Sequence, residues 1–169
     1  MNPTARLALR RLLPALLLAA PLLACTAKRE QLPTVTLYKS PACDCCGKWA
    51  EHLEDAGFTV ARKDTDDLAA MRQAMGMPEA FASCHTAKIG DLLVEGHVPA
   101  TDIKRLLAEQ ANPATAHAGV IGVAAPGMPL GSPGMETPTP QDFDTLLVRA
   151  DGTFSLYQHH AANAAKAHQ

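Results

Sequence analysis

Three cysteines lie within four residues, at Cys43, Cys45 and Cys46, between a β-branched run and a segment with helical spacing. A helix that begins here directs its free backbone N–H groups, and the positive end of its dipole, toward the side chains of its first turn. That field favours the thiolate form of cysteine. A thiolate is the nucleophile of disulfide exchange and also a ligand of soft metals, so this turn predicts either redox chemistry or metal binding.

Further soft or borderline donors follow along the chain. Cys84 is followed directly by His85, and His97 comes soon after. Met128 and Met135 each follow Pro-Gly, in a segment where a thioether has no helix to pack against. Thiolate with thioether selects Cu(I), whereas four thiolates alone would serve zinc equally well. Histidine can complete either kind of site.

The segments around these residues alternate between strand and helix patterns. Strands are predicted over 34–39, 58–64, 86–89 and 92–95, and helices over 45–56, 68–76 and 101–110. Gly90-Asp91 predicts a tight turn between the last two strands. With right-handed crossovers, the order β-α-β-α-β-β-α is compatible with an α/β, thioredoxin-like or glutaredoxin-like sheet whose reactive thiols lie at the end of the first strand.

In such a fold the loop that enters the third strand lies against the turn with the first three cysteines. Cys84 is therefore expected to face Cys43, Cys45 and Cys46, which would bring four sulfurs together from two loops. The alternative is that Cys84 is a buried, inert cysteine. His52, on the first predicted helix, is expected to face solvent.

The second half of the chain changes in composition. Residues 112–140 are rich in Pro, Gly, Ala and Ser and predict one long loop without strand or helix. Residues 144–160 predict a hairpin around Asp151-Gly152 that adds strands at the edge of the sheet. Residues 161–169 are expected to form a flexible tail.

The first 24 residues have the pattern of an export signal. Arg6, Arg10 and Arg11 precede an apolar run that is short and interrupted by proline. Residues 22–25, Leu-Leu-Ala-Cys, resemble a bacterial lipobox and predict cleavage before Cys25 and lipidation of this residue. The alternative is an ordinary cleavage site that leaves Cys25 as a spare thiol. We expect a signal peptide over 1–24, a tether over 25–33, one domain over 34–160, and a periplasmic protein of a Gram-negative bacterium that is lipid-anchored to a membrane.

The net charge argues against nucleic-acid binding, and the cysteine spacing argues against a purely structural disulfide. The 169-residue chain has a formal net charge of −2 with scattered Lys and Arg, so it lacks the basic footprint of a nucleic-acid-binding protein. Three of the four cysteines after Cys25 are crowded into four residues, where a disulfide would close too small a loop to be an effective structural cross-link.

Three segments resemble the CopG-type periplasmic proteins of bacterial copper-resistance operons, a family once catalogued as a domain of unknown function. The segments are YKSPACDCCGKWAEHLEDAGF (38–58), SCHTAKIGDLLVEGHVPATDIKRLL (83–107) and APGMPLGSPGME (125–136). The resemblance implies a thioredoxin-like fold, a Cys-x-Cys-Cys copper site, a partner cysteine at Cys84, and copper handling that includes interconversion of Cu(I) and Cu(II). Asp44 inside the motif, and a longer, Ala-rich run over 112–123, depart from the family pattern.

The leading hypothesis is a copper-binding protein of copper resistance that holds Cu(I), with more than one copper per chain. Its candidate ligands are Cys43, Cys45, Cys46, Cys84, His85, His97, Met128 and Met135. Its expected partners are copper ions, other periplasmic copper-handling or redox proteins, and a membrane through the lipid anchor. One alternative is a thiol–disulfide oxidoreductase that uses Cys43 and Cys46 as its catalytic pair, and another is a structural zinc module. Whether the protein is an enzyme, as a copper or thiol oxidoreductase, stays open at this stage.

Overall fold

A computed structural model describes residues 31–162 of the chain. The expected signal peptide, the lipidation site Cys25 and most of the expected tail therefore lie outside the described residues. Within the described range, no helix has the length and apolar character needed to cross a membrane.

The described part contains seven strands, three α-helices and one short 3-10 helix, η1. In chain order these are β1 (Val35–Lys39), α1 (Asp44–Asp55), β2 (Val60–Asp64), α2 (Leu68–Met75), η1 (Glu79–Phe81), β3 (His85–Ile89), β4 (Leu92–Gly96), α3 (Ala100–Ala111), β5 (Val120–Ala125), β6 (Phe143–Arg149) and β7 (Phe154–His160). Apart from η1, the order of elements up to α3 is the order that the sequence predicts.

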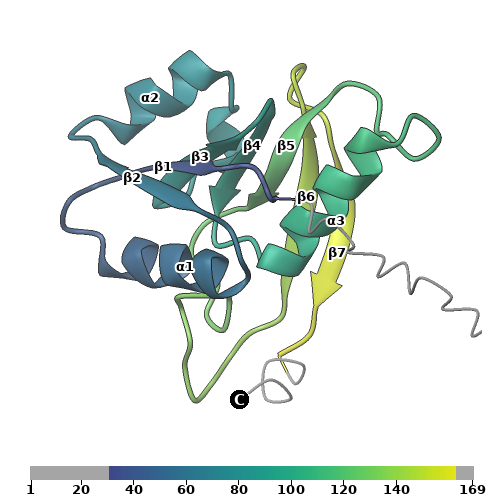
Figure 1. The fold of residues 1–169 in the computed structure, drawn as a ribbon. Coiled ribbons are helices and arrows are strands. Elements are labelled where there is room, and N and C mark those ends of the chain that lie inside the picture. The colour runs from purple at the N-terminus through teal and green to yellow at the C-terminus, as the bar shows by residue number, and fades with distance from the viewer. Residues whose placement is uncertain (1–30, 163–169) are drawn as a thin grey trace, which may run out of the picture. The chain divides into compact units, whose positions relative to one another are not determined.

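All the strands belong to one mixed sheet with the order β2-β1-β3-β4-β5-β6-β7 (Figure 1). The pairs β1–β2 and β4–β5 are parallel, and the other neighbours are antiparallel. Ile89 pairs with Leu92 across the predicted Gly90-Asp91 turn, where Gly90 has a φ of 58°. Only glycine adopts such a φ without strain, which explains why the hairpin turns at this residue.

The two faces of the sheet carry separate apolar clusters. Trp49 and Leu53 of α1 and Ile103 of α3 belong to the larger cluster, on one face. Met77 and Phe81 cover a smaller cluster on the other face, which Met75 of α2 also contacts. Neighbouring residues on β4, β5 and β6 alternate between the clusters, as the two-residue period of a strand requires. In Figure 1, α1 and α2 accordingly lie on opposite sides of the sheet.

The prediction of one loop over residues 112–140 is wrong, because this range contains β5. The strand has the sequence VIGVAA, and it pairs with β4 and β6 in the interior of the sheet. A short apolar run of this kind, buried on both faces, lacks the alternation that marks a half-exposed strand. Pro, Gly and Ala around it obscured the signal.

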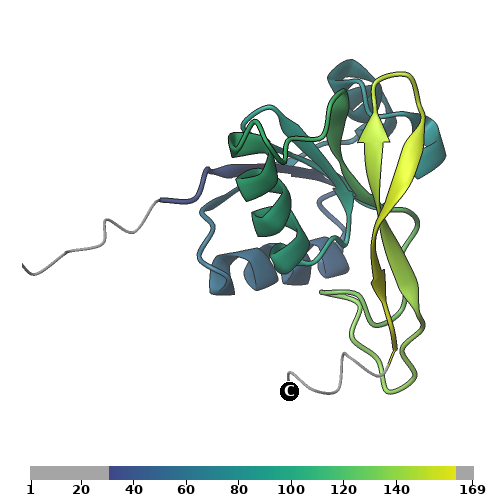
Figure 2. The same ribbon diagram turned by 90° about the vertical axis from the view of Figure 1, so that its right-hand side faces the viewer.

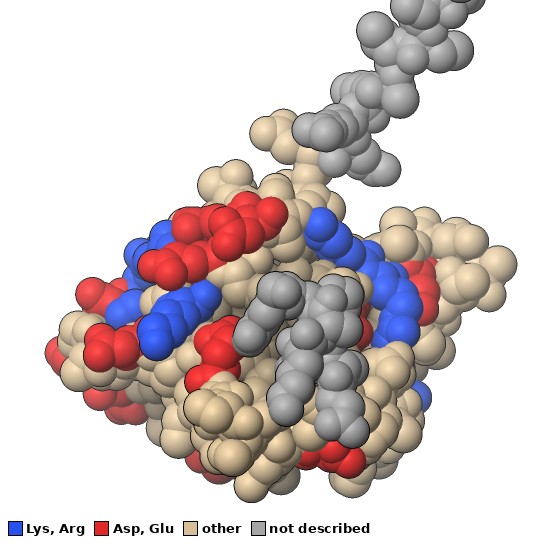
Figure 3. Space-filling model, turned by 90° about the horizontal axis from the view of Figure 1, so that it is seen from below, with Lys and Arg blue, Asp and Glu red and all other residues tan. Residues whose placement is uncertain are grey.

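The predicted C-terminal hairpin is present as β6 and β7. β6 pairs with β5, and β7 forms the edge of the sheet. Figure 2 shows the two strands as a twisted ribbon along one side of the molecule. Acidic and basic side chains form small separate groups on the face that Figure 3 shows, and neither sign covers this face.

Candidate metal centre

The first three cysteines lie where β1 turns into α1. Cys43 is the N-cap residue of the helix, with an extended backbone, and Cys45 and Cys46 belong to its first turn. The turn is closed by the Cys43 backbone N–H, which donates to the Ser40 carbonyl at 3.0 Å. Cys46 is fully buried, whereas Cys43 and Cys45 are partly exposed. The motif thus presents its sulfurs at the edge of the larger apolar cluster.

Cys84 approaches the same place from the other side, because it immediately precedes β3. Strand β3 pairs with β1, and His85 lies opposite Lys39. Lys39 is the last residue of β1, so Cys84 lies beside the turn that carries the other three cysteines. The pairing of two strands that are distant in sequence therefore brings the fourth sulfur to the motif.

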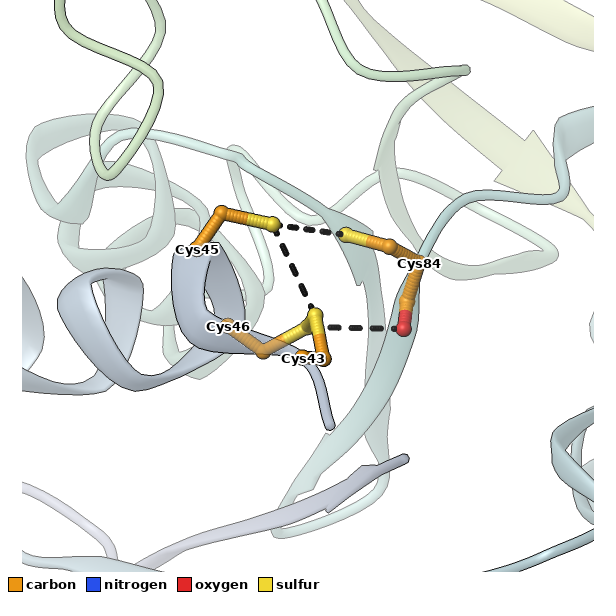
Figure 4. Close-up of side chains that lie close together, drawn as sticks. All are labelled: Cys43, Cys45, Cys46 and Cys84. Atoms are coloured by element: carbon orange, nitrogen blue, oxygen red, sulfur yellow. Dashed lines mark hydrogen bonds between the residues drawn. A yellow bond between two sulfur atoms is a disulfide. The ribbon is translucent and has the colours of Figure 1, made fainter. Parts of the chain in front are cut away.

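The four sulfur atoms lie within 4.8 Å of one another (Figure 4). Cys43 and Cys46 form a disulfide, while Cys45 and Cys84 are free. The Cys45 sulfur is 3.5 Å from that of Cys43 and 3.9 Å from that of Cys84. Of the thiolates that the sequence predicts at this turn, two are therefore tied up in a disulfide and become metal ligands only after reduction.

Cys84 also belongs to a second group, with His85 and His97, whose ligand atoms lie within 4.8 Å of one another. The His97 Nε2 is 2.9 Å from the Cys84 sulfur. The His97 Nδ1–H donates to the Pro133 carbonyl at 2.8 Å, and burial lowers the pKa of His97. The neutral ring therefore carries its proton on Nδ1 and directs the Nε2 lone pair toward Cys84, as a metal-ligating histidine does.

His85 is fully buried between the rings of Trp49 and His97, with centroid distances of 4.4 and 4.9 Å. Its Nδ1 is 3.4 Å from the Cys84 sulfur, and its buried Nε2 has no hydrogen-bond partner among the described residues. Burial, together with the unfavourable effect of a second ionisable ring at His97, lowers the pKa of His85 to about 3. A neutral imidazole with an unsatisfied buried nitrogen is costly to keep unless something binds it.

The free thiol of Cys84 is held in its protonated form. Burial raises its pKa to about 12, and the neighbouring Cys45 acts in the same direction. A metal that binds here must displace the proton, because the thiolate is the ligand. Cys84 could therefore serve as a metal ligand only where a cation compensates for the negative charge that burial disfavours.

The segment that carries Met128 and Met135 folds back over the cysteines. Gly127 forms an isolated bridge with Ser83, next to Cys84. Gly134 has a φ of 83°, and a Cβ at this position would come within 2.7 Å of the Cys45 carbonyl oxygen. The backbone immediately before each of the two methionines thus lies against the loops that carry the cysteines. Met128 is itself 55% exposed and Met135 is partly buried, so thioether ligation stays a prediction.

Sequence reasoning missed several residues of this region. His52 was expected in solvent, but it is partly buried, and its Nε2 accepts the Ala100 backbone N–H at 3.1 Å. Arg72 and Glu95 are buried and bonded to the loop that holds Cys84. A charge within the apolar run of β4 was the available signal for Glu95, because an unpaired charge is hardly ever buried.

The chain is similar to a catalogued family and to two solved structures. A family described as "Protein of unknown function, DUF411" matches residues 81–135, which include Cys84, His97 and the methionine segment. Two solved structures, titled "Copper resistance protein copG- Form 1" and "Form 2", are each 34% identical to the chain. They have TM-scores of 0.69 and 0.68 and cover 77% and 76% of this chain and 98% of their own. No curated protein matches the chain. At this identity and coverage, the chain belongs to the family of the copper resistance protein CopG.

Proposed function

We propose that the protein binds Cu(I) in a copper-resistance pathway, through the sulfurs of Cys43, Cys45, Cys46 and Cys84. The observation that carries the proposal is the convergence of these sulfurs within 4.8 Å, with Cys84 shared by a second group that contains His85 and His97. Two overlapping donor sets offer room for more than one copper ion, with Cys84 in common.

The chemistry of the donors favours copper over zinc. Cysteine thiolates and methionine thioethers are soft ligands that select Cu(I), and neutral imidazole also suits copper. A structural zinc site would need only the four sulfurs. It would leave unexplained the unsatisfied Nε2 of His85, the orientation of His97 and the packing of the methionine segment over Cys45.

The disulfide supports a redox role for the same cysteines. Thiolates of Cys43 and Cys46 would each transfer one electron to a Cu(II) ion, and the two sulfurs would join in the disulfide that the structure contains. Two Cu(II) and two thiolates would thus become two Cu(I) and one disulfide, with no other oxidant. Reduction of the disulfide by a thiol partner would restore the two copper-binding thiolates.

We further infer that the core is thioredoxin-like and that the protein works in the periplasm. The sheet order β2-β1-β3-β4, with the cysteines at the end of β1, supports the first inference. The lipobox-like residues before Cys25 support export, lipid anchoring and access to other copper-handling or redox proteins of that compartment. Release of the protein from membranes by Cys25→Ala would test the anchor, and retention of this variant would contradict it.

The decisive experiment measures copper after reduction of the disulfide. The purified, reduced protein is loaded with Cu(I) without oxygen and is then challenged with a strong Cu(I) chelator. We expect more than one copper per chain to remain, and Trp49, the single tryptophan, to report binding by quenched fluorescence through its contact with His85. Protein kept in its oxidised form is the matched control and should retain less copper. Loss of all copper from the reduced protein would contradict the proposal.

A thiol–disulfide oxidoreductase is the second candidate, because the disulfide joins a partly exposed Cys43 to a fully buried Cys46. An exposed first cysteine can be attacked by a substrate thiol, whereas a buried second one resolves the mixed disulfide. Reduction of insulin that depends on Cys43 and is indifferent to copper would favour this function. Absence of such activity in a protein that retains Cu(I) would exclude it.

A further inference from the structure

A buried ion pair lies behind the loop that carries Cys84. Arg72 of α2 is 4% exposed and Glu95 of β4 is fully buried. The Arg72 Nε donates to the Glu95 Oε1 at 2.9 Å. Removing two charges from water costs several kcal/mol, and apolar residues of similar volume are often at least as stabilising. The pair therefore calls for an explanation beyond stability.

Both members of the pair bind the backbone of Ser83, which precedes Cys84. The Ser83 N–H donates to the Glu95 Oε1 at 2.7 Å, and the Arg72 Nη2 donates to the Ser83 carbonyl at 2.8 Å. The other carboxylate oxygen of Glu95 accepts the hydroxyl of Thr86. The chain is thus held immediately before and immediately after the two candidate ligands Cys84 and His85.

The hydrogen bonds around Ser83 also reach the segment that carries Met128 and Met135. The Ser83 hydroxyl donates to the Gly127 carbonyl, and the Gly127 N–H donates to the Ala82 carbonyl at 3.2 Å. Gly96 lies so close that a Cβ there would come within 2.5 Å of the Ser83 hydroxyl. Ser83 is therefore the point where the Cys84 loop, β4 and the segment that leads to Met128 meet.

We propose that Arg72 and Glu95 are positioning residues that hold Cys84 and His85 in the geometry of the copper site. They act through Ser83 and Thr86, and this inference rests on the function proposed above. Ordered partners outside the ligand set keep metal ligands in place, and their removal typically lowers metal affinity by about 10- to 100-fold. The ion pair would thus maintain the 3.9 Å separation of the Cys45 and Cys84 sulfurs against the thermal motion of a loop.

The test compares Cu(I) affinities, measured by chelator competition on the reduced full-length protein, for the wild type, Glu95→Gln and Arg72→Met. We expect each variant to bind Cu(I) about 10- to 100-fold more weakly than the wild type. X-ray absorption at the copper edge should show fewer sulfur ligands per copper. Asp102→Asn is the matched control, because Asp102 is only 4% exposed and hydrogen-bonds to Thr145, away from the cysteines. It should lose stability but retain its copper affinity.

A double-mutant cycle separates positioning from a general loss of structure. If the ion pair acts through Cys84 and His85, Glu95→Gln should change the copper affinity little in a background that carries Cys84→Ser and His85→Gln, since both ligands to be positioned are already gone. Equal effects of Glu95→Gln in both backgrounds would overturn the inference. So would unchanged copper affinity and sulfur coordination in both ion-pair variants.

The outcome also distinguishes this inference from the proposed function. A wild-type protein that fails to retain Cu(I) contradicts the function itself, whereas tight binding by the wild type and the ion-pair variants alike contradicts only the positioning role. If both ion-pair variants fail to fold, Thr86→Val removes a single hydroxyl contact to Glu95 at nearly constant volume. We expect this variant to lower the Cu(I) affinity too, and an unchanged affinity would overturn the inference.

Discussion

Glu95 and Asp102 are two buried carboxylates with closely similar partners and different surroundings. Glu95 binds the hydroxyl of Thr86 and the guanidinium of Arg72. Asp102 accepts the hydroxyl of Thr145 at 2.7 Å and lies 2.8 Å from the Nε2 of His160. Each carboxylate thus joins a threonine of the sheet to a second polar side chain. For Glu95 of β4 this side chain comes from α2, and for Asp102 of α3 it comes from β7.

The difference lies in what each carboxylate holds. Asp102, in the first turn of α3, connects that helix to β6 and β7, far along the sheet from β1. Glu95 holds Ser83, the residue next to Cys84. Similar hydrogen bonds therefore hold the terminal hairpin in one place and the loop that carries Cys84 in the other. The two carboxylates are alike in burial and differ in the backbone to which they are connected: only Glu95 is bonded to the loop that carries Cys84.

The largest loss of copper affinity should come from removing the Cys45 sulfur, which lies between those of Cys43 and Cys84. Cys45 is the free thiol closest to both the Cys43 and the Cys84 sulfurs. We expect Cys45→Ser to lower the Cu(I) affinity by more than about 100-fold, because loss of a ligand should exceed loss of a residue that only supports ligands. His160→Gln, on the Asp102 side, should bind copper as the wild type does. Chelator competition measures both, and a normal affinity of the Cys45 variant would refute the sulfur site.

The next largest effect is a loss of stability when the Asp102 carboxylate is removed. We expect Asp102→Ala to lower the free energy of unfolding by about 3 kcal/mol, because it leaves buried polar partners unsatisfied. Urea denaturation of the oxidised, metal-free protein measures this loss. The copper affinity of the folded variant should be unchanged. A weaker copper site in this variant would remove the distinction between the two carboxylates.

Two glycines with the same backbone requirement offer a smaller, matched test. Gly134 and Gly119 have φ values of 83° and 71°, but only at Gly134 would a Cβ meet other atoms, the Cys45 carbonyl among them. We expect Gly119→Ala to cost about 1 kcal/mol of stability through strain alone. Gly134→Ala should cost about 2 kcal/mol and also lower the Cu(I) affinity, because the segment must move off α1. Equal effects of the two variants on copper binding would contradict this packing.

The smallest effect should be a pH dependence that arises outside the metal centre. Burial lowers the pKa of His52 below 6.5, although Glu136 and Asp55 raise it. The neutral ring accepts the N–H of Ala100 at the start of α3. A pKa that is lower in the folded state means that the stabilisation is present above pH 6.5 and is lost as the pH falls through the folded-state value.

His52→Gln removes this titration. We expect its free energy of unfolding to be about 0.5 kcal/mol lower at pH 7 and to fall less steeply than that of the wild type as the pH is lowered. Urea titrations at a series of pH values measure the two slopes. Parallel slopes would show that His52 titrates alike in the folded and unfolded protein.

Apart from η1, local patterns in the sequence were sufficient to predict the order of elements from β1 to α3. Val35 and Leu37 alternate along a strand, Gly57 and Gly76 end helices, and Gly90-Asp91 turns a hairpin. Such signals depend on neighbours in the chain, so they can be recognised without a fold. The strand β5 was missed because its pairing with β4 and β6 and its packing into both apolar clusters involve residues that are distant in the sequence.

The donor atoms of the protein can be read from the amino-acid sequence: three crowded cysteines, a Cys-His pair and two Pro-Gly-Met segments. The expected fold already placed Cys84 opposite the other three cysteines, whereas the strand pairing and side-chain orientations that bring the donors together are visible only in the folded protein. Pairing of β3 with β1 brings Cys84 to the helix, the Pro133 carbonyl orients His97, and a buried ion pair holds Ser83. Donor arrangement depends on hydrogen-bond geometry and burial, which are properties of groups in space. Spacing along the chain specifies only which groups are available.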